Sequence, residues 1–336
     1  MRLTLLFVAL ALAACGSGAT GQVEISGSAM GTQYSVKLPR LQDGHDAASL
    51  REAIDVVLDG DNARMSTYMA DSEISLFNAS RSVEWQPVSP DLCRNIEQSQ
   101  AISELTNGAF DITVGPLVNL WGFGPGEIID EPPSADAIAA LLQLTGFENL
   151  HVDCAGQAIK KDVPGLMVDL SAIGKGFAAE SVGQLLAAMG YENFLVEVGG
   201  ELSIRGMNAQ GEPWAIGIEA PLANQRRPHT VINLTNTGLA TSGDYRNFFA
   251  ADGKIYSHTI DTRTGRPVTH TLASVTVVDP SAARADALAT ALLVMGPEEG
   301  MVFAERERLA VLMLIRTNGG IEERQSAAFA GLRDIT

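Results

Sequence analysis

Apolar and polar positions alternate along this chain with two periods, which predicts a mixed α/β protein. Period-two alternation and short apolar runs predict strands over 24–38, 150–161, 166–170, 193–198, 201–219, 231–234, 273–278 and 309–316. Helical spacing between capping and stop residues predicts helices over 47–65, 89–106, 134–144, 177–189, 281–295 and 298–308. Gly31 interrupts 24–38, which is either a hairpin or a bent strand, and 150–161 is expected to be a hairpin. Turn residues over 208–211 predict antiparallel strands within 201–219, and 65–78 shows no clear period.

The segment 168–180 (VDLSAIGKGFAAE) combines a predicted strand, a glycine turn and the start of a helix, and a second strand follows the helix. Such a unit can hold a phosphate, because backbone N–H groups are free at a helix start and the helix dipole favours an anion there. Lys175 adds a cation to this turn, and Asp169 adds a carboxylate where the predicted strand ends.

Gly174 and Gly176 also satisfy the loose dinucleotide pattern G-x-G-x-x-G/A, and Glu197 follows at about the distance of a ribose partner. However, the glycines come several residues after the predicted strand, and Gly176 stands where a phosphate loop has Ser or Thr. The local pattern therefore leaves two interpretations open: a nucleotide-binding turn, or a glycine turn that only closes a strand–helix pair.

The chain is acidic, with a formal net charge of −17, which disfavours a nucleic-acid partner and requires a local cation for any phosphate ligand. Asp286 and Thr290 lie at i and i+4 of a predicted helix, on one face. A carboxylate and a hydroxyl are hard oxygen ligands suited to Mg²⁺. The alternative is a helical Asp that complements the dipole and a Thr that bonds back to its own helix.

The N-terminus is typical of a secreted lipoprotein. Arg2 precedes an apolar run over 3–14 that is too short to span a membrane, and the following LAAC (12–15) resembles a lipoprotein cleavage box. We therefore expect a signal peptide over 1–14, lipidation of Cys15 and a flexible tether over 15–22, with the acyl chains as the membrane anchor. The alternative is an ordinary secretory signal in which Cys15 occurs by chance. An oxidising compartment would allow Cys93 and Cys154 to pair, and the sequence leaves open whether they do.

Several short segments, in this order along the chain, together resemble the ApbE family of flavin transferases, which attach FMN to proteins and use FAD as the donor. The likeness runs from about residue 25 to about residue 316. Thr262 departs from the family pattern, which usually has Pro there, and this changes turn stiffness but no chemical group. The segments are MGTQY (30–34), MSTY (65–68), DSEIS (71–75), GAFD (108–111), DLSAIGKG (169–176), VGGE (198–201), TSGD (241–244), HTID (258–261), TGRP (264–267) and ADALAT (285–290).

The resemblance implies one domain over 23–336, an α/β (α+β mixed) fold in a T-fold-like arrangement. Its mixed, largely antiparallel sheets would carry packed helices and hold FAD in a central cleft. The residues that match FAD-binding positions are Met30, Tyr68, Ala109, Phe110, Asp111, Asp169, Lys175 and Ile260. The matches to metal-binding positions are the backbone carbonyl of Ala172 and the side chains of Asp286 and Thr290. His258 matches a histidine near the chemistry and is the candidate general base, with Asp244 as the competing candidate.

The expected function is that of a Mg²⁺-dependent FAD:protein FMN transferase, lipid-anchored at the periplasmic side of a bacterial membrane. It would transfer FMN to a Thr or Ser of acceptor redox proteins and release AMP. Gly16 rather than Asp follows Cys15, so the outer membrane stays open beside the inner membrane that the family favours. Two alternatives use the same site: an FAD pyrophosphatase with water as nucleophile, and a non-catalytic FAD-binding lipoprotein.

Overall fold

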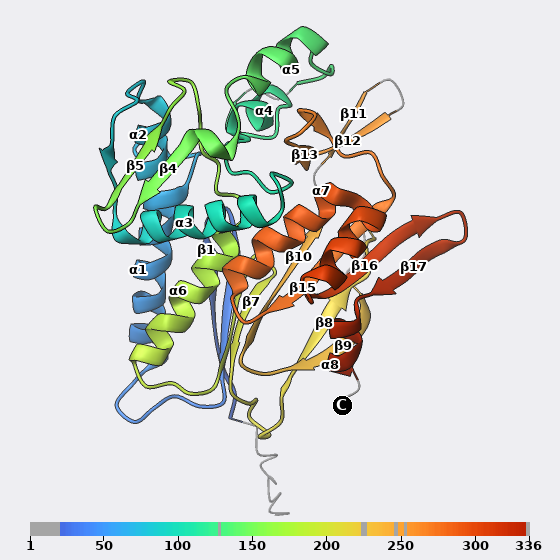
Figure 1. The fold of residues 1–336 in the computed structure, drawn as a ribbon. Coiled ribbons are helices and arrows are strands. Elements are labelled where there is room, and N and C mark those ends of the chain that lie inside the picture. The colour runs from blue at the N-terminus through green and yellow to red at the C-terminus, as the bar shows by residue number, and fades with distance from the viewer. Residues whose placement is uncertain (1–20, 127–128, 223–226, 245–247, 252–253, 334–336) are drawn as a thin grey trace, which may run out of the picture.

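The computed structural model describes residues 21–126, 129–222, 227–244, 248–251 and 254–333. Its centre is an eight-stranded sheet in the order β1-β2-β6-β7-β10-β15-β16-β17, and each neighbouring pair runs antiparallel (Figure 1). The strands are β1 (Val23–Ala29), β2 (Thr32–Leu38), β6 (Phe194–Val198), β7 (Glu201–Arg205), β10 (Thr237–Gly243), β15 (Leu272–Asp279), β16 (Ala310–Thr317) and β17 (Gly320–Gln325).

Helices cover one face of this sheet. α1 (Ala47–Met65) and α6 (Gly174–Ala188) pack on β1, β2 and β6, and α7 (Ala282–Arg306) packs on β10 and β15 (Figure 1). The opposite face carries the hairpin of β8 (Trp214–Glu219) and β9 (Pro228–Leu234), together with α8 (Ala327–Arg333). Strand periodicity explains the two layers, because successive side chains of a strand point to opposite faces. On β6, for example, Val196 and Val198 join the helical side while Leu195 joins the hairpin side.

A second group of elements packs beside the helical layer. It contains a small three-stranded sheet in the order β3-β5-β4, which is joined to α3 by a disulfide between Cys93 and Cys154. Two short hairpins, β11–β12 and β13–β14, complete it. The elements are α2 (Glu73–Ala79), β3 (Gln86–Pro87), α3 (Pro90–Leu105), α4 (Gly115–Leu120), α5 (Ala135–Leu142), η1 (Phe147–Asn149), β4 (Leu150–Asp153), β5 (Ala158–Lys161), β11 (Phe248–Ala251), β12 (Lys254–Ser257), β13 (Ile260–Asp261) and β14 (Arg266–Pro267).

The helix α7 bends near its middle, where Gly296 has φ +81° and Pro297 follows. Pro297 has no N–H to donate to the carbonyl of Leu293, one turn earlier. The side chain of His270 supplies this bond, because its Nε2 lies 2.7 Å from the Leu293 oxygen. By length and composition α7 could cross a membrane, but 67% of its most apolar window is buried, as in a core helix.

Three expectations about the elements are wrong. The buried segment 166–170 is not a strand, and its β-pairing is a single bridge between Val114 and Met167. The strands of 201–219 do not pair with each other, because β7 lies between β6 and β10 while β8 pairs with β9. The helices α2 and α4 lie in segments for which no helix was predicted.

The disulfide closes a loop over a sequence separation of 61 residues. Restricting a loop of this length in the unfolded chain is worth about 4 kcal/mol in the chain-entropy model. We expect the double variant Cys93→Ala/Cys154→Ala to lose about 2–4 kcal/mol of unfolding free energy in urea titrations. Wild-type protein unfolded with a reductant should show the same loss, and an unchanged midpoint in both experiments would contradict the prediction.

The buried Lys161 should make stability depend on pH. Its side chain is 0% exposed, and burial, with a smaller contribution from the charge of Arg81, lowers its pKa to about 8. Above pH 8 the folded state therefore holds fewer protons than the unfolded chain, whose lysines titrate near 10.4, so stability rises with pH across this window. We expect Lys161→Met to remove a rise of about 3 kcal/mol from unfolding curves. The matched variant Lys160→Met, at a partly exposed neighbour, should keep the rise; equal slopes in both variants would refute the assignment.

Candidate active site

Two turns at the same end of the large sheet border the candidate site. Met30 and Gly31 form the turn between β1 and β2, and Gly199 and Gly200 form the turn between β6 and β7. All four residues have positive φ, between +51° and +108°. A side chain at Gly199 would begin 2.9 Å from Cδ of Lys175, so glycine is required there both by conformation and by space. The first turn places Met30 beside the start of α6, and the second turn lies against Lys175, which belongs to the first turn of this helix.

Lys175, the second residue of α6, lies between two buried carboxylates. Its Nζ is 2.5 Å from Oε1 of Glu201 on β7, and the Asp286 carboxylate on α7 is close enough to raise its pKa. Burial alone would lower the pKa of Lys175, but the charges of Asp286 and Glu201 raise it above its usual range. Glu201 and Asp286 are 2% and 3% exposed. When all three groups are ionised, the cluster carries a net charge of −1.

The two carboxylates respond to this crowding. Burial raises the pKa of Glu201 to about 8, opposed by Lys175 and reinforced by the charge of Asp286. Burial also raises the pKa of Asp286, and Lys175 opposes that shift. One oxygen of Glu201, Oε2, is buried without a hydrogen-bond partner. Ionising both carboxyl groups would leave the site with more negative charge than Lys175 neutralises, and a further cation bound here would offset that charge.

The donor set beside this cluster fits a hard divalent cation. Asp286 and Thr290 stand one turn apart on α7, and Oγ of Ser242 on β10 lies 3.1 Å from Oγ1 of Thr290. Ala172 lies in the turn directly before α6. Within the part of the chain that the structure describes, no group of three His, Cys, Asp or Glu side chains forms a metal cluster. A metal here would depend on hydroxyl and carbonyl oxygens besides Asp286, a combination suited to Mg²⁺.

Gly176 of the GKG turn is required for packing. A Cβ on Gly176 would lie 2.3 Å from the backbone oxygen of Ala282 and 2.8 Å from Cβ of Asp286. The N–H of Gly176 donates to Oδ2 of Asp286 at 3.0 Å. The amide that a dinucleotide turn would offer to a phosphate is therefore bonded to the protein's own carboxylate. Glu197, the expected ribose partner, lies on β6 with Ser35 3.4 Å away and takes no part in the cluster.

Tyr68 and Asp169 lie near each other at the edge of the site. Tyr68 is 69% exposed, and its hydroxyl donates to the backbone oxygen of Phe123 at 3.3 Å. Partial burial, followed by the charge of Asp169, raises the pKa of Tyr68. Asp169 is buried, and its Oδ1 accepts the N–H of Ser171 at 2.8 Å. An exposed aromatic ring beside a buried carboxylate can stack on a planar ligand and orient its polar edge.

Ala109, Phe110 and Asp111 form a buried loop. The side chains of Ala109 and Phe110 lie in the interior, so a ligand can reach them only through the backbone. Asp111 accepts hydrogen bonds from the N–H and the hydroxyl of Thr113, each at 2.7 Å, and from the N–H of Phe147 at 3.0 Å. Burial raises the pKa of Asp111 to about 6 despite these donors. Its carboxylate organises the loop from within.

The two candidate bases have different surroundings. The ring of His258 is partly buried and meets Phe123 edge-on, with centroids 6.3 Å apart, so Phe123 contacts both His258 and Tyr68. Asp244 follows β10, and its two oxygens accept from the Arg316 guanidinium at 2.8 and 2.5 Å. Both oxygens of the Asp244 carboxylate are therefore engaged by one guanidinium group.

Two further candidates remain. Ile260 is buried with Leu117, Trp121 and Ile138, so its side chain belongs to a small apolar cluster. Cys15 lies outside the described residues.

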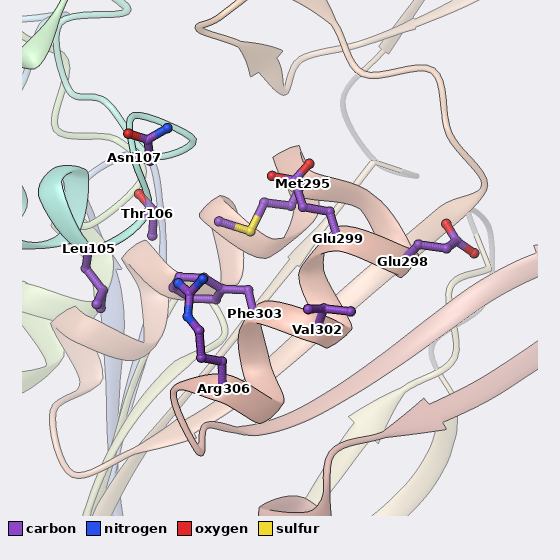
Figure 2. A pocket seen from close by; sticks show the side chains of 9 residues that line it. All are labelled: Leu105, Thr106, Asn107, Met295, Glu298, Glu299, Val302, Phe303 and Arg306. Atoms are coloured by element: carbon purple, nitrogen blue, oxygen red, sulfur yellow. The ribbon is translucent and has the colours of Figure 1, made fainter.

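A cavity of about 500 Å³ lies elsewhere, between the end of α3 and the second half of α7 (Figure 2). Its walls are apolar, with Glu298, Glu299 and Arg306 at the rim, and none of the candidate site residues lines it. Its acidic side chains already have partners, because Glu299 pairs with Arg263 and Glu298 with Arg324.

An antiparallel sheet that ends in a lysine beside two buried carboxyl groups, with an exposed aromatic ring nearby, defines an α/β protein with a polar site suited to a phosphate group and a cation. Known proteins resemble this chain in sequence and in fold. The ApbE family profile matches residues 30–313. The chain is 44% identical over 320 residues to the FAD:protein FMN transferase of Vibrio cholerae, covering 95% of each, and 41% identical over 313 residues to that of Escherichia coli K12, covering 93% of this chain and 89% of that protein.

The solved structures agree. The flavin transferase ApbE from Vibrio cholerae superposes with a TM-score of 0.85 at 44% identity, covering 93% of this chain and 99% of that one. The apo form of the Pseudomonas stutzeri flavinyl transferase ApbE gives a TM-score of 0.84 at 38% identity, covering 93% and 96%. This chain belongs to the ApbE family, and the expected α/β fold with largely antiparallel sheets is confirmed.

Glu201 is the site residue to which sequence reasoning gave no role. It closes the VGGE segment directly after the turn of β6 and β7, and only the folded sheet brings it to Lys175. The one local signal was an acidic residue behind two glycines at the end of an apolar strand.

The charge cluster predicts losses of stability of different size for two variants, each of which replaces a charged side chain by a neutral one of similar volume. Lys175→Met leaves two buried carboxylates without their cation and should cost about 3–5 kcal/mol of unfolding free energy at neutral pH. Glu201→Gln keeps Lys175 paired with Asp286 and should cost less than about 1 kcal/mol. Urea titrations without divalent metal measure both, and equal losses would show that the two carboxylates do not share the lysine.

Proposed function

We propose that this protein transfers FMN from FAD to a Thr or Ser hydroxyl of an acceptor protein and releases AMP. The observation that carries the proposal is the cluster of Lys175 with the buried carboxyls Glu201 and Asp286 beside Thr290, in a chain whose relatives are named FAD:protein FMN transferase. The oxygen atoms of Asp286 and Thr290 give an acidic protein a local site for the cation that a pyrophosphate requires.

The reaction is a phosphoryl transfer. The acceptor oxygen forms a bond to the FMN phosphorus of FAD, and the bond from this phosphorus to the bridging oxygen breaks. AMP leaves with the bridging oxygen, and the proton of the acceptor hydroxyl passes to a base. Such a transfer needs mainly positioning and neutralisation of charge on the phosphoryl oxygens.

The side chains divide these tasks. Lys175 places a positive charge beside the phosphates, and Asp169 and Tyr68 orient the nucleotide and the flavin ring. His258 accepts the proton, since an imidazole titrates near neutral pH and its ring lies against Phe123, next to Tyr68. Asp244 stays bound to Arg316 and positions the end of β10.

Mg²⁺ is the cation that the residues fit best. Asp286, Thr290 and the carbonyl of Ala172 would hold it. When bound, Mg²⁺ supplies the charge that polarises a phosphoryl oxygen. Ser242 would orient the Thr290 hydroxyl, which it meets at 3.1 Å.

The N-terminal signal and the disulfide support a proposal about the location of the protein. We place the protein at the periplasmic side of a bacterial membrane, anchored through Cys15, with acceptors among membrane redox proteins. The bond between Cys93 and Cys154 suits an oxidising compartment. β1 starts at Val23 and runs seven residues to Ala29 beside the site, about 20 Å, so the site lies at the strand end opposite the tether.

The test combines the protein, FAD, Mg²⁺ and an acceptor domain from a membrane redox complex, and it measures the acceptor mass and the AMP released. We expect an FMN-sized mass gain on a Thr or Ser, one AMP per FMN, and loss of both with a chelator or with Asp286→Ala. Glu298→Ala, at an exposed carboxylate of the same helix, is the matched control and should stay active.

Other outcomes distinguish the alternatives. AMP formed without acceptor would indicate an FAD pyrophosphatase, and bound FAD without any AMP would indicate a binding protein. The acceptor domain in this test should be one that a relative is able to modify. If that domain gains no FMN, either of these two results would overturn the proposed transferase function.

A further inference from the structure

The short helix α2 connects two parts of the candidate site. The loop before it carries Tyr68, and its far end meets the irregular segment 166–173, which carries Asp169 and Ala172. The sequence alone did not indicate that α2 links these two segments. The hydrogen bonds at the two ends explain how these parts are kept together.

The first turn of α2 fixes the Tyr68 loop. The hydroxyls of Ser72 and Ser75 both donate to the backbone oxygen of Ser66, at 2.6 and 3.2 Å. Ser72 also caps the helix, because its Oγ accepts the N–H of Ser75 at 3.1 Å. Tyr68 therefore lies in a closed turn that is attached to the start of α2 by hydrogen bonds.

The last turn of α2 fixes the Asp169 segment. The side chain of Asn78 bonds both backbone groups of Val168: its Nδ2 donates to the carbonyl at 2.8 Å, and its Oδ1 accepts the N–H at 2.7 Å. This is the pair of bonds that a neighbouring strand would supply. Because Val168 directly precedes Asp169, these bonds from Asn78 fix the position of the backbone from which the Asp169 carboxylate projects.

The buried Lys161 reinforces the same joint. Its Nζ donates to the carbonyls of Phe77 and Asn78, at 3.1 and 3.4 Å, and to that of Leu166 at 3.0 Å. The ammonium also lies 4.8 Å from the centre of the Phe77 ring. Three carbonyls account for its three protons, so this cation joins the end of α2 to a point two residues before Val168.

The segment 166–173 depends on these side chains for its position. Among the described residues, its β-pairing is the single bridge from Met167 to Val114, and the N–H of Asp169 donates to the carbonyl of Ile112 at 2.7 Å. A strand in the sheet would be held by a row of such bonds. Here Asn78 and Lys161 replace the missing neighbour.

We propose that Asn78 and Lys161 are positioning residues of the FAD site, which act through α2 to set the spacing between Tyr68 and Asp169. This inference rests on the proposed function, in which these two residues contact FAD. Neither Asn78 nor Lys161 touches the ligand itself. Their loss should weaken FAD binding more than it slows the chemical step.

The experiment titrates FAD fluorescence with wild-type protein and with Asn78→Ala, and measures KM for FAD and kcat for FMN transfer. We expect the Kd and the KM to rise about tenfold, or about 1.4 kcal/mol, with kcat changed about twofold or less. Lys161→Met keeps the volume and the Asn78 bonds, and it should raise the Kd about threefold. It also provides the test if Asn78→Ala does not fold.

Asn208→Ala is the matched control for lost stability. The Asn208 side chain likewise accepts and donates, taking the N–H of Gln210 and Glu212 and donating to the carbonyl of Pro213, but in the loop after the far end of β7. It should leave Kd and KM unchanged. Wild-type binding with an unchanged Kd in both Asn78→Ala and Lys161→Met would overturn the inference alone, whereas a wild type that neither binds FAD nor transfers FMN would overturn the proposed function as well.

Discussion

The burial of two carboxylates beside one partly exposed lysine constrains the rest of this structure. Lys175, Glu201 and Asp286 come from α6, β7 and α7, and a carboxylate as buried as Glu201 or Asp286 would cost several kcal/mol if it were ionised and unpaired. The two helices and the strand must therefore pack so that these three side chains meet at one point. Gly176 lets α6 approach α7 because any side chain there would strike the Ala282 backbone, and the sheet brings Glu201 to the same point.

The same cluster links folding to ligand choice. With its groups ionised it carries one negative charge more than it neutralises, and Oε2 of Glu201 has no partner. Without a further cation, the raised carboxyl pKa values favour protonation, which lowers this charge, whereas a divalent cation beside Asp286 and Thr290 would favour the ionised carboxylates and offset their charge. A metal bound there would then present positive charge to a pyrophosphate on a protein whose net charge of −17 otherwise repels it.

Sequence patterns predicted the elements whose causes are local. α1 begins and ends where it was expected, at Ala47 and Met65, and Ser89 caps α3 as predicted, because spacing and caps lie within a few residues. α2 was missed since seven residues are too few to show a period, and its ends are held by side chains far along the chain, such as Lys161. The apolar run 166–170 resembled a strand because burial alone makes it apolar, while its backbone bonds go to Asn78.

For the candidate site, the sequence named residues but not their partners. Local patterns and the family resemblance both pointed to Asp169, Lys175, Asp286 and Thr290, whereas Glu201 and Asn78 act across 26 and 90 residues, and no local pattern signals such pairs. The GKG turn illustrates the limit. In a parallel sheet its free N–H groups would face a nucleotide, but this sheet is antiparallel and Asp286 takes the N–H of Gly176. In the proposed function, phosphate recognition would therefore depend on the charges that the turn holds in place rather than on the turn's own backbone.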